Sequence, residues 1–319
     1  LQQHDPTRYI KLHRRTAKWF EQDNNVEEAV YHYLAAQDHS YAATLMERVA
    51  VEWFTRGRVE TLLRWIKKLP RETRKQAPRL ALHHSRVLAD RNDYETAQQA
   101  LIDAEAGFAD QEDTVGLAKV DNQRAMIRLF EGRYQDALAA AQKALDILDE
   151  GEVIERANAQ RYIGKAHIGL GHFTEGVSKL QEALALRRQV GSPYNVVNLL
   201  QDLTLAFTTQ GRFDEAVACL NEALVIGRRL GTPSQLSGIL NNLGWIYHIR
   251  GKYQEALELY EEGLAASRRG NDLRWQAYIS AGIADVYRDI GIYKRASPFY
   301  STGWQIAQNG EPRLALYIL

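Results

Sequence analysis

The sequence has few of the features that mark secreted, membrane-bound or nucleic-acid-binding proteins. Its one cysteine, Cys219, cannot form a disulfide within the chain, which favours a reducing, cytoplasmic setting. No run approaches the roughly 18 apolar residues of a membrane helix, and the opening LQQHDPTRY does not resemble a signal peptide. Forty basic residues balance forty acidic ones, so the chain lacks the basic charge that binds nucleic acid or anionic lipid. We therefore expect neither nucleic acid nor membrane as a partner.

Catalytic and cofactor motifs are also missing. No Ser-His-acid spacing, H-E-x-x-H or G-x-x-x-x-G-K-[ST] occurs, and Gly164-Lys165 lacks the leading glycine and the hydroxyl residue of a phosphate loop. His83 and His84 are adjacent, so on a helix they face different directions, and no further ligands complete a tetrahedral set. We expect this segment to be no enzyme and to hold no metal or cofactor.

What the sequence does contain is a repeat. With 45% hydrophobic and 25% charged residues, the 319-residue chain can bury a large core. A turn signature of glycine, any residue, an aromatic residue and a small residue three positions later recurs at spacings of 39, 40, 40 and 40. Its glycines are Gly132, Gly171, Gly211, Gly251 and Gly291, and Asn92 keeps the pattern one repeat earlier. Since this residue follows a helix in the left-handed conformation, asparagine is an acceptable substitute.

A second set of glycines lies halfway between the first, so each repeat has two helices and two turns. Its members are Gly151, Gly191, Gly231, Gly270 and Gly310. Around Gly191 and Gly231 the sequence contains all the signals of a helix end and a helix start. Basic residues end one helix and glycine closes it, and then Ser192 or Thr232 caps the next helix and proline begins it. We interpret the arginine pairs 187–188 and 228–229 as helix-end charges in water, with no partner required.

The apolar positions between turns follow the helical period, as in the stripe Ala216, Leu220, Ala223, Leu224 and Gly227. One hairpin cannot bury such a face, so neighbouring repeats must stack. The sequence predicts an all-α, right-handed superhelical solenoid of antiparallel helix pairs. Residues 1–78 break the period and predict an irregular helical arm, with a loop at 70–78. Residues 79–319 predict about six repeats and a truncated seventh.

The repeats resemble a known family. Leu243-Gly244-x-x-Tyr247, followed by Ala256-x-x-x-Tyr260, is similar to the tetratricopeptide signature L-G-x-x-Y and A-x-x-x-F. The resemblance covers residues 80–310. The repeats depart from the family in two ways: they have 40 residues rather than 34, and Arg268 stands where the family's closing proline would be.

The irregular N-terminal part has a narrower resemblance. Residues 12–70 look like the helical arm that follows the ATPase core in MalT-type regulators, which are STAND signal-transduction ATPases. In that family a nucleotide-binding module precedes the arm, a tetratricopeptide sensor follows it, and a LuxR-type helix-turn-helix often ends the chain. The resemblance implies a sensor piece of a larger switch. ATP or ADP with Mg, and an intramolecular ATPase partner, are then expected in a module outside this segment. The initial leucine and the incomplete repeat after Gly310 also suggest a fragment, and its uncovered Leu314, Leu316 and Ile318 could mediate self-association.

In tetratricopeptide proteins the first helix of each pair lines a concave groove, and the resemblance implies which residues here would face it. They are Lys119, Asn122, Asn158, Arg161, Lys165, Asn198, Gln201, Asn241, Trp245, His248 and Tyr278. Equivalent positions hold a ladder of Asn122, Arg161, Gln201 and Asn241, which suits hydrogen bonds to a peptide backbone or a polar small molecule, although exposed helix positions are polar in any case. Trp245 offers a large contact area at little entropic cost, unless it packs between repeats.

Charge along the predicted groove varies. Lys119, Arg161 and Lys165 make its middle basic, while Asp285 and Asp289 make its C-terminal end acidic, so we hypothesise a ligand with an anionic group. Two functions compete. The first is a ligand-sensing, autoinhibitory repeat domain of a STAND regulator that binds a peptide, protein or small-molecule inducer. The second is a freestanding tetratricopeptide scaffold that binds partner peptides.

Overall fold

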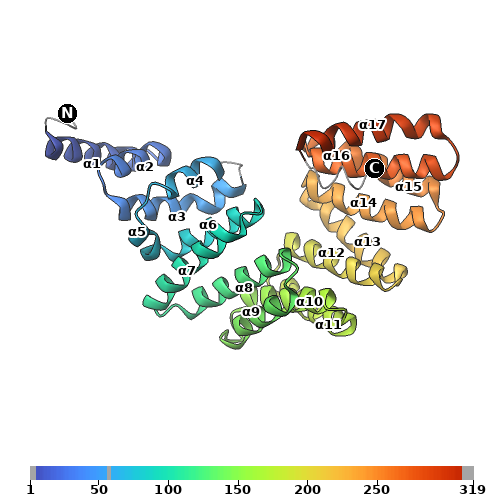
Figure 1. Cartoon of the computed structure of the whole chain (residues 1–319), viewed down its shortest axis with the longest axis horizontal. Coiled ribbons are helices and arrows are strands. Elements are labelled where there is room, and N and C mark those ends of the chain that lie inside the picture. The colour runs from blue at the N-terminus through green and yellow to red at the C-terminus, as the bar shows by residue number, and fades with distance from the viewer. Residues whose placement is uncertain (1–4, 56–58, 311–319) are drawn as a thin grey trace. The chain divides into compact units, whose positions relative to one another are not determined.

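The protein is all-α. The computed structural model describes residues 5–55 and 59–310, which form seventeen helices and no strand (Figure 1). The chain divides into two compact units, an N-terminal unit (Leu1–Leu170) and a C-terminal unit (Gly171–Leu319), and each is described by itself. None of the described helices is long and apolar enough to cross a membrane.

The helices of the N-terminal unit are α1 (Pro6–Gln22), α2 (Val26–Ala35), α3 (His39–Thr55), α4 (Val59–Ile66), α5 (Arg71–Gln76), α6 (Pro78–Asp90), α7 (Tyr94–Asp110), α8 (Thr114–Phe130), α9 (Tyr134–Asp146) and α10 (Val153–Gly169). Those of the C-terminal unit are α11 (Phe173–Gln189), α12 (Pro193–Thr209), α13 (Phe213–Leu230), α14 (Pro233–Ile249), α15 (Tyr253–Arg269), α16 (Leu273–Asp289) and α17 (Tyr293–Gly310).

The first five helices have unequal lengths, in agreement with a sequence that does not repeat there. Their shared core contains Tyr33, Met46, Trp53 and Trp65, all buried. The predicted loop at 70–78 was wrong, because α5 occupies most of it between Pro70 and Pro78. Whether residues 1–78 act as a separate arm stays a prediction. Residues 56–58 and the residues Leu314, Leu316 and Ile318 lie outside the described part of the chain.

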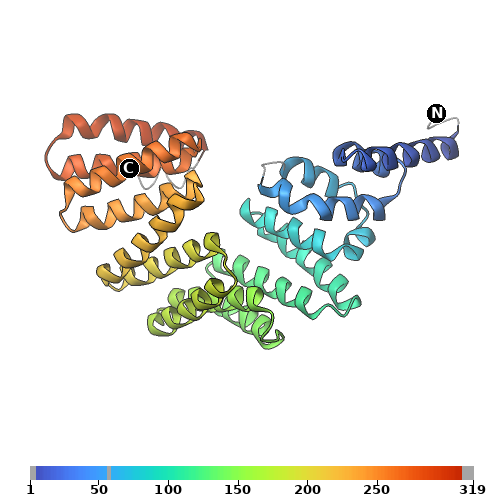
Figure 2. The ribbon, with the colours of Figure 1, turned by 180° about the vertical axis from the view of Figure 1, so that it is seen from behind.

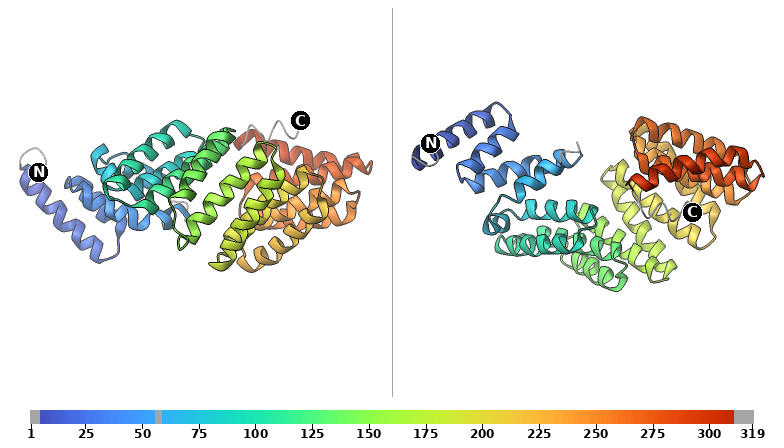
Figure 3. Two further views of the ribbon diagram at one scale, coloured as in Figure 1. Left: turned by 90° about the horizontal axis from the view of Figure 1, so that it is seen from below. Right: turned by 45° about the horizontal axis from the view of Figure 1, so that its top comes forward.

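From α6 to α9 in the N-terminal unit, and from α12 to α17 in the C-terminal unit, the helices pack as consecutive antiparallel pairs, which confirms the predicted repeat. Within the C-terminal unit, α14 packs along α15 and α16 along α17, and Figures 1, 2 and 3 show these helices side by side from several directions. The turn inside each pair has the predicted left-handed residue. The φ angles are 74° at Gly132, 84° at Gly171, 71° at Gly211, 70° at Gly251, 81° at Gly291 and 62° at Asn92.

The second turn is less uniform than its glycine spacing predicts. Gly191 and Gly231 are left-handed, with φ of 63° and 66°. Gly270 is not: its φ is −85°, and Asn271 takes the left-handed conformation instead. Gly270 serves a close approach, since a Cβ there would lie 2.8 Å from the Cβ of Pro233. Ser192 and Thr232 occupy capping positions but make no side-chain cap hydrogen bond.

The arginines at the helix ends have protein partners, which corrects our interpretation of them as charges in water. Arg188 Nη2 lies 2.6 Å from Glu222 Oε1, and Arg228 Nη2 lies 2.8 Å from Glu262 Oε2. The two pairs join α11 to α13 and α13 to α15 at the same 34-residue separation. Arg187 is only 6% exposed. The repeat therefore places a carboxylate of the next second helix beside each of Arg188 and Arg228.

Aromatic rings that lie on helical glycines hold successive helices together. A Cβ at Gly116 of α8 would lie 2.2 Å from the ring of Phe108. In the C-terminal unit, Cβ atoms at Gly244 and Gly282 would lie 2.9 and 2.6 Å from the ring of Tyr260. Phe108 and Tyr260 are each about 1% exposed. Because a ring replaces the missing side chain, these glycines set the spacing of the helices that carry the predicted ligand residues.

Candidate functional site

A cavity of about 310 Å³ in the N-terminal unit brings together three of the residues predicted from sequence, Lys119, Asn122 and Asn158. We call it the N-terminal cavity. Its walls come mainly from α6, α8 and α10, the first helices of successive pairs, which is where the family resemblance places a groove. The complete lining is Arg79, Leu82, His83, Phe108, Asp113, Gly116, Lys119, Asn122, Gln123, Glu155 and Asn158.

Two amides hold one carboxylate in the wall of this cavity. Asn122 Nδ2 donates to the main-chain oxygen of Glu155 at 3.1 Å and to its Oε2 at 3.3 Å, and Asn158 Nδ2 donates to the same Oε2 at 3.0 Å. Neutral donors orient the Glu155 carboxylate without cancelling its charge. No lysine or arginine of the described chain forms an ion pair with it. Glu155 is thus a fixed anionic group at the cavity.

The wall also contains polar atoms that bond to nothing in the described structure. Asn122 Oδ1 and Gln123 Nε2 are buried without a hydrogen-bond partner, in side chains that are 4% and 8% exposed. Burying an unsatisfied amide atom costs about 1–3 kcal/mol. Such groups are rare in folded proteins, and each one suggests a missing ligand, ion or water. This cavity has two of them on consecutive residues of α8.

The rim of the cavity is basic. Arg79 on α6 and Lys119 on α8 are exposed, and neither forms an ion pair with a carboxylate in the described chain. His83 lies between them in the lining, and burial together with nearby Lys119 lowers its pKa, which favours the neutral imidazole. Asp113 caps α8, where its Oδ1 accepts from Gly116 N at 2.7 Å and its charge faces the positive end of the helix dipole.

The other two predicted residues of the N-terminal unit do not line this cavity. Arg161 and Lys165 are half-buried on α10 and absent from the lining. The sequence reasoning also missed residues that do line it, notably Arg79, His83, Gln123 and Glu155. Glu155 lies three residues before Asn158, so the helical i, i+3 spacing was a signal that could have found it.

In the C-terminal unit, a smaller cavity of about 180 Å³ contains the predicted residues Asn198 and Gln201. Gln235 of α14 spans its wall, where Nε2 donates to the main-chain oxygen of Tyr194 and to Asn198 Oδ1, both at 3.3 Å. The indole of Trp275 covers Gly238, where a Cβ would lie 2.7 Å from the ring. Sequence reasoning missed Gln235 and Trp275, which lie one 40-residue period apart in the first turns of α14 and α16. Predicted Tyr278 is half-buried, with its ring 5.8 Å from that of Trp275.

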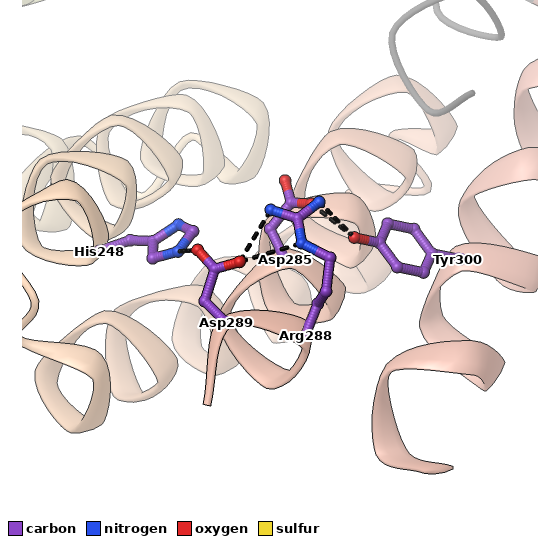
Figure 4. Close-up of polar contacts among 5 residues, drawn as sticks. All are labelled: His248, Asp285, Arg288, Asp289 and Tyr300. Carbon is purple, nitrogen blue, oxygen red and sulfur yellow. Dashed lines mark hydrogen bonds and ion pairs between the residues drawn. The ribbon is translucent and has the colours of Figure 1, made fainter. Parts of the chain in front are cut away.

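The three residues singled out on α14 have different surroundings. Trp245 is 40% exposed. Asn241 Nδ2 donates to the neighbouring Asn242 Oδ1 at 3.3 Å. His248 is engaged within the protein, since its Nε2 lies 2.9 Å from Asp289 Oδ2 (Figure 4). The sequence predicts His248 as a ligand-binding residue, and in the structure its ring contacts the carboxylate of Asp289 on the next first helix.

Figure 4 shows that this contact belongs to a network across α14, α16 and α17. Arg288 donates through Nε to Asp289 at 2.9 Å and through Nη1 to Asp285 at 2.8 Å, and the hydroxyl of Tyr300 donates to Asp285 at 2.6 Å. The hydrogen bond from His248, followed by Arg288, lowers the pKa of Asp289, while burial raises that of Tyr300 to about 12. Arg288 therefore pairs with both carboxylates of the predicted acidic end, Asp285 and Asp289.

Metal-binding geometry is not found in the described residues, where no three His, Cys, Asp or Glu side chains gather around a point. Burial lowers the pKa of His84 to about 4, and its Nε2 is buried without a partner. His83 and His84 project differently, His83 alone being part of the cavity lining.

Comparisons with known proteins agree with the repeat architecture. A tetratricopeptide-repeat family model matches residues 155–229 and 205–269. The chain is 27% identical over 212 residues to the HTH-type transcriptional regulator MalT of Serratia proteamaculans; the match covers 62% of this chain and 24% of MalT, so the chain spans only a part of that relative's length.

Two solved structures share the fold. One is a signal transduction ATPase with numerous domains (STAND) from Pyrococcus horikoshii that carries a tetratricopeptide repeat sensor, with a TM-score of 0.71 and 16% identity over 98% of this chain and 48% of that one. The other is a Rap protein complexed with competence and sporulation factor, with a TM-score of 0.59 and 14% identity over 93% and 95% of the two chains.

The 40-residue period, the left-handed turns, the helix pairs and the matched family model agree with one another. The chain therefore contains tetratricopeptide repeats, and it resembles the repeat sensor region of MalT-type STAND regulators.

Proposed function

We propose that this chain is the ligand-sensing region of a MalT-type regulator, and that an inducer binds the face formed by the first helices of its repeats. Binding would favour one of two forms of the whole protein, which requires different affinities for the two forms. In this proposal a nucleotide-binding module elsewhere in the regulator holds ATP or ADP with Mg, and the arm of residues 1–78 transmits the change to it. The regulator would be cytoplasmic, and this segment would not catalyse a reaction.

The observation that carries the proposal is the convergence of Lys119, Asn122 and Asn158 on one cavity. The family pattern predicts all three as groove residues, and they lie on two different helices, α8 and α10. The cavity volume of about 310 Å³ is at the lower end of the range for small-molecule sites. Asn122 Oδ1 and Gln123 Nε2 have no hydrogen-bond partner in the described structure, and polar groups of a ligand would supply one.

A thermal-shift screen of the chain against metabolites and short peptides tests the proposal, because a ligand that prefers the folded form raises Tm by mass action. We expect a hit whose binding weakens at least about tenfold in Asn122→Leu, a loss typical of one or two polar contacts. The matched control is Asn271→Gly, which changes an amide in a left-handed turn that is not part of the lining. A hit that binds Asn122→Leu and the wild type equally would contradict a site at this cavity.

The alternative function, a scaffold for partner peptides, is favoured by one observation in the C-terminal unit. Leu205 on α12 and Trp245 on α14 occupy equivalent repeat positions and are 60% and 40% exposed. Exposed apolar side chains on successive first helices would suit the side chains of an extended peptide. The Rap protein that was solved in complex with competence and sporulation factor has the same fold.

Fluorescence titration with peptides separates the two functions. A scaffold should show peptide binding that changes tryptophan emission in the wild type but not in Trp245→Phe, whereas Trp19→Phe, another exposed tryptophan, should behave as the wild type does. Arg161→Glu with Lys165→Glu tests the hypothesis of an anionic ligand. Unchanged affinity and salt dependence in that double variant would argue against it.

A further inference from the structure

We propose that the ligand of the N-terminal cavity is a small zwitterion that carries a primary ammonium group and a carboxylate, such as a free amino acid or a dipeptide. The inference rests on the proposed sensing function and adds the chemical class of the inducer. It comes from the opposite charges on the two sides of one small cavity and from the unsatisfied amide atoms between them.

The anionic side of the cavity is made by α10 and the adjoining face of α8. Asn122 and Asn158 orient the Glu155 carboxylate, which has no cationic partner in the described chain, and Asn122 Oδ1 is an acceptor without a donor. A primary ammonium group has three N–H donors and a positive charge. It would satisfy the Asn122 oxygen and neutralise Glu155 together. Asp113 does not compete for it, because that carboxylate already caps α8.

The cationic side is made by α6 and the preceding turn of α8. Lys119 lies three residues before Asn122, so the two side chains share one helix face with Cβ atoms about 5–6 Å apart. Arg79 faces the same cavity from α6. A carboxylate placed here gains charge-assisted hydrogen bonds, which are stronger than those between neutral groups. Gln123 Nε2, a buried donor without an acceptor, adds a further position for an oxygen.

The remaining surface accepts a hydrocarbon group. Leu82 and the buried ring of Phe108 form its apolar part, and the ring lies against Gly116, where a side chain would collide with it. A volume of about 310 Å³ limits the ligand to a molecule of one or two residues. Charge at both ends and a hydrocarbon group between them describe an amino acid or a dipeptide.

Calorimetric titration of the chain with free amino acids and dipeptides tests the proposal. Each compound is paired with its N-acetylated and its C-amidated derivative, which remove one charge each. We expect saturable binding of at least one unblocked compound and at least about tenfold weaker binding of both derivatives. Comparison of the amino acids with the dipeptides identifies which of the two sources supplies the zwitterion.

Variants assign the two charges to the cavity. Glu155→Gln keeps the size and polarity of the side chain and should weaken the unblocked ligand about 10- to 100-fold, while leaving the affinity for its N-acetylated derivative nearly unchanged. Lys119→Gln should also weaken the unblocked ligand about 10- to 100-fold, while leaving the affinity for its C-amidated derivative nearly unchanged. Glu150→Gln, an exposed carboxylate in the turn before α10, is the matched control and should bind as the wild type does. Circular dichroism confirms that each variant is folded.

Three results would overturn the proposal. The first is no binding of any unblocked amino acid or dipeptide at about 10 mM, a concentration at which even a site of millimolar Kd is mostly filled. The others are equal binding of blocked and unblocked compounds, and normal ligand binding by Glu155→Gln and Lys119→Gln. The sensing function fails separately. If a compound of another class binds and Asn122→Leu abolishes that binding, the sensor proposal stands and the zwitterion is excluded.

Discussion

Polar side chains on the first helices have different surroundings at two places, one in each unit. In the N-terminal unit, Asn122 and Gln123 keep buried atoms without partners beside a cavity. In the C-terminal unit, His248 is joined to Asp289 and through it to Arg288 in a closed network. The C-terminal unit also keeps one such atom, since Gln235 Oε1 is buried without a partner at the smaller cavity. The next first helix supplies a carboxylate to His248, whereas the helices packed around Asn122 and Gln235 leave one polar atom of each without a partner.

The largest effects should appear where the two units are alike, in the aromatic rings that lie on glycines. Phe108→Ala and Tyr260→Ala should each lower the free energy of unfolding by about 3–5 kcal/mol, because both leave a large cavity in a tight core. Urea unfolding followed by circular dichroism measures this loss. Only Phe108→Ala should also weaken ligand binding, since Tyr260 lies outside the N-terminal cavity. Equal binding losses in both variants would remove the distinction between the units.

The next effect concerns a buried imidazole of the N-terminal unit. Burial lowers the pKa of His84 to about 4, compared with about 6.5 in the unfolded chain. Between these values the unfolded state binds more protons, so the free energy of unfolding falls as the pH drops through that window. From pH 7 to pH 5 the loss due to His84 should be about 2 kcal/mol. The side chain in His84→Gln cannot ionise between pH 7 and pH 5, so the urea midpoint of this variant should depend less on pH. If the midpoints of variant and wild type change equally with pH, His84 is not the source of the loss.

A smaller effect tests whether the unsatisfied amides belong to function rather than to stability. Gln123→Met removes a buried donor without a partner and should raise the free energy of unfolding by about 1 kcal/mol while weakening ligand binding. Gln201→Met, at a half-buried position of the C-terminal unit, should change stability by less than about 0.5 kcal/mol. Denaturant midpoints and calorimetry measure both quantities. Destabilisation by Gln123→Met would mean that its amide has a partner in solution.

The smallest effect concerns the closed network of the C-terminal unit. Because the pKa of Asp289 is lowered, its contribution to stability is present above about pH 4 and is lost as the pH falls through the lower, folded-state pKa. Asp289 is partly exposed, so Asp289→Asn should lower the free energy of unfolding by less than about 1 kcal/mol, and less in high salt. Glu261→Gln on α15, an exposed control, should have no measurable effect. A loss that salt does not reduce would indicate a packing role for Asp289.

Much of the fold could be predicted because it depends on local chemistry. The left-handed glycines at 132, 171, 211, 251 and 291 follow from the need to end a helix and reverse direction within a few residues. In the predicted stripe, Ala216, Leu220, Ala223 and Gly227 are buried and Leu224 is half-buried. The prediction failed at residues 70–78, where two prolines suggested a loop and instead flank the short helix α5. Proline at the first position of a helix begins it as well as it ends the preceding one.

The site was harder to predict because it depends on contacts between helices. The pattern selected Lys119, Asn122 and Asn158 as residues that face a concave groove, and in the structure these three line one cavity. It could not show that Asp289 satisfies His248, that Glu222 and Glu262 pair with Arg188 and Arg228, or that Gln235 and Trp275 share a second cavity. Each of these contacts joins residues 34 to 41 positions apart, on helices whose relative rotation is set by packing.

Sequence alone determined the helix pairs, their turns, their period and the apolar faces that make them stack, because these depend on spacing along one chain. Tertiary structure decided which polar side chains are left over. Around Asn122, Gln123 and Glu155 the packed helices supply amides and a ring that lies on a glycine, but no ion-pair partner for Glu155 within the described chain. One repeat pattern can therefore give a cavity at one place and a closed network at another, since hydrogen bonds and ion pairs need partners within about 3–4 Å and only packing brings those partners there.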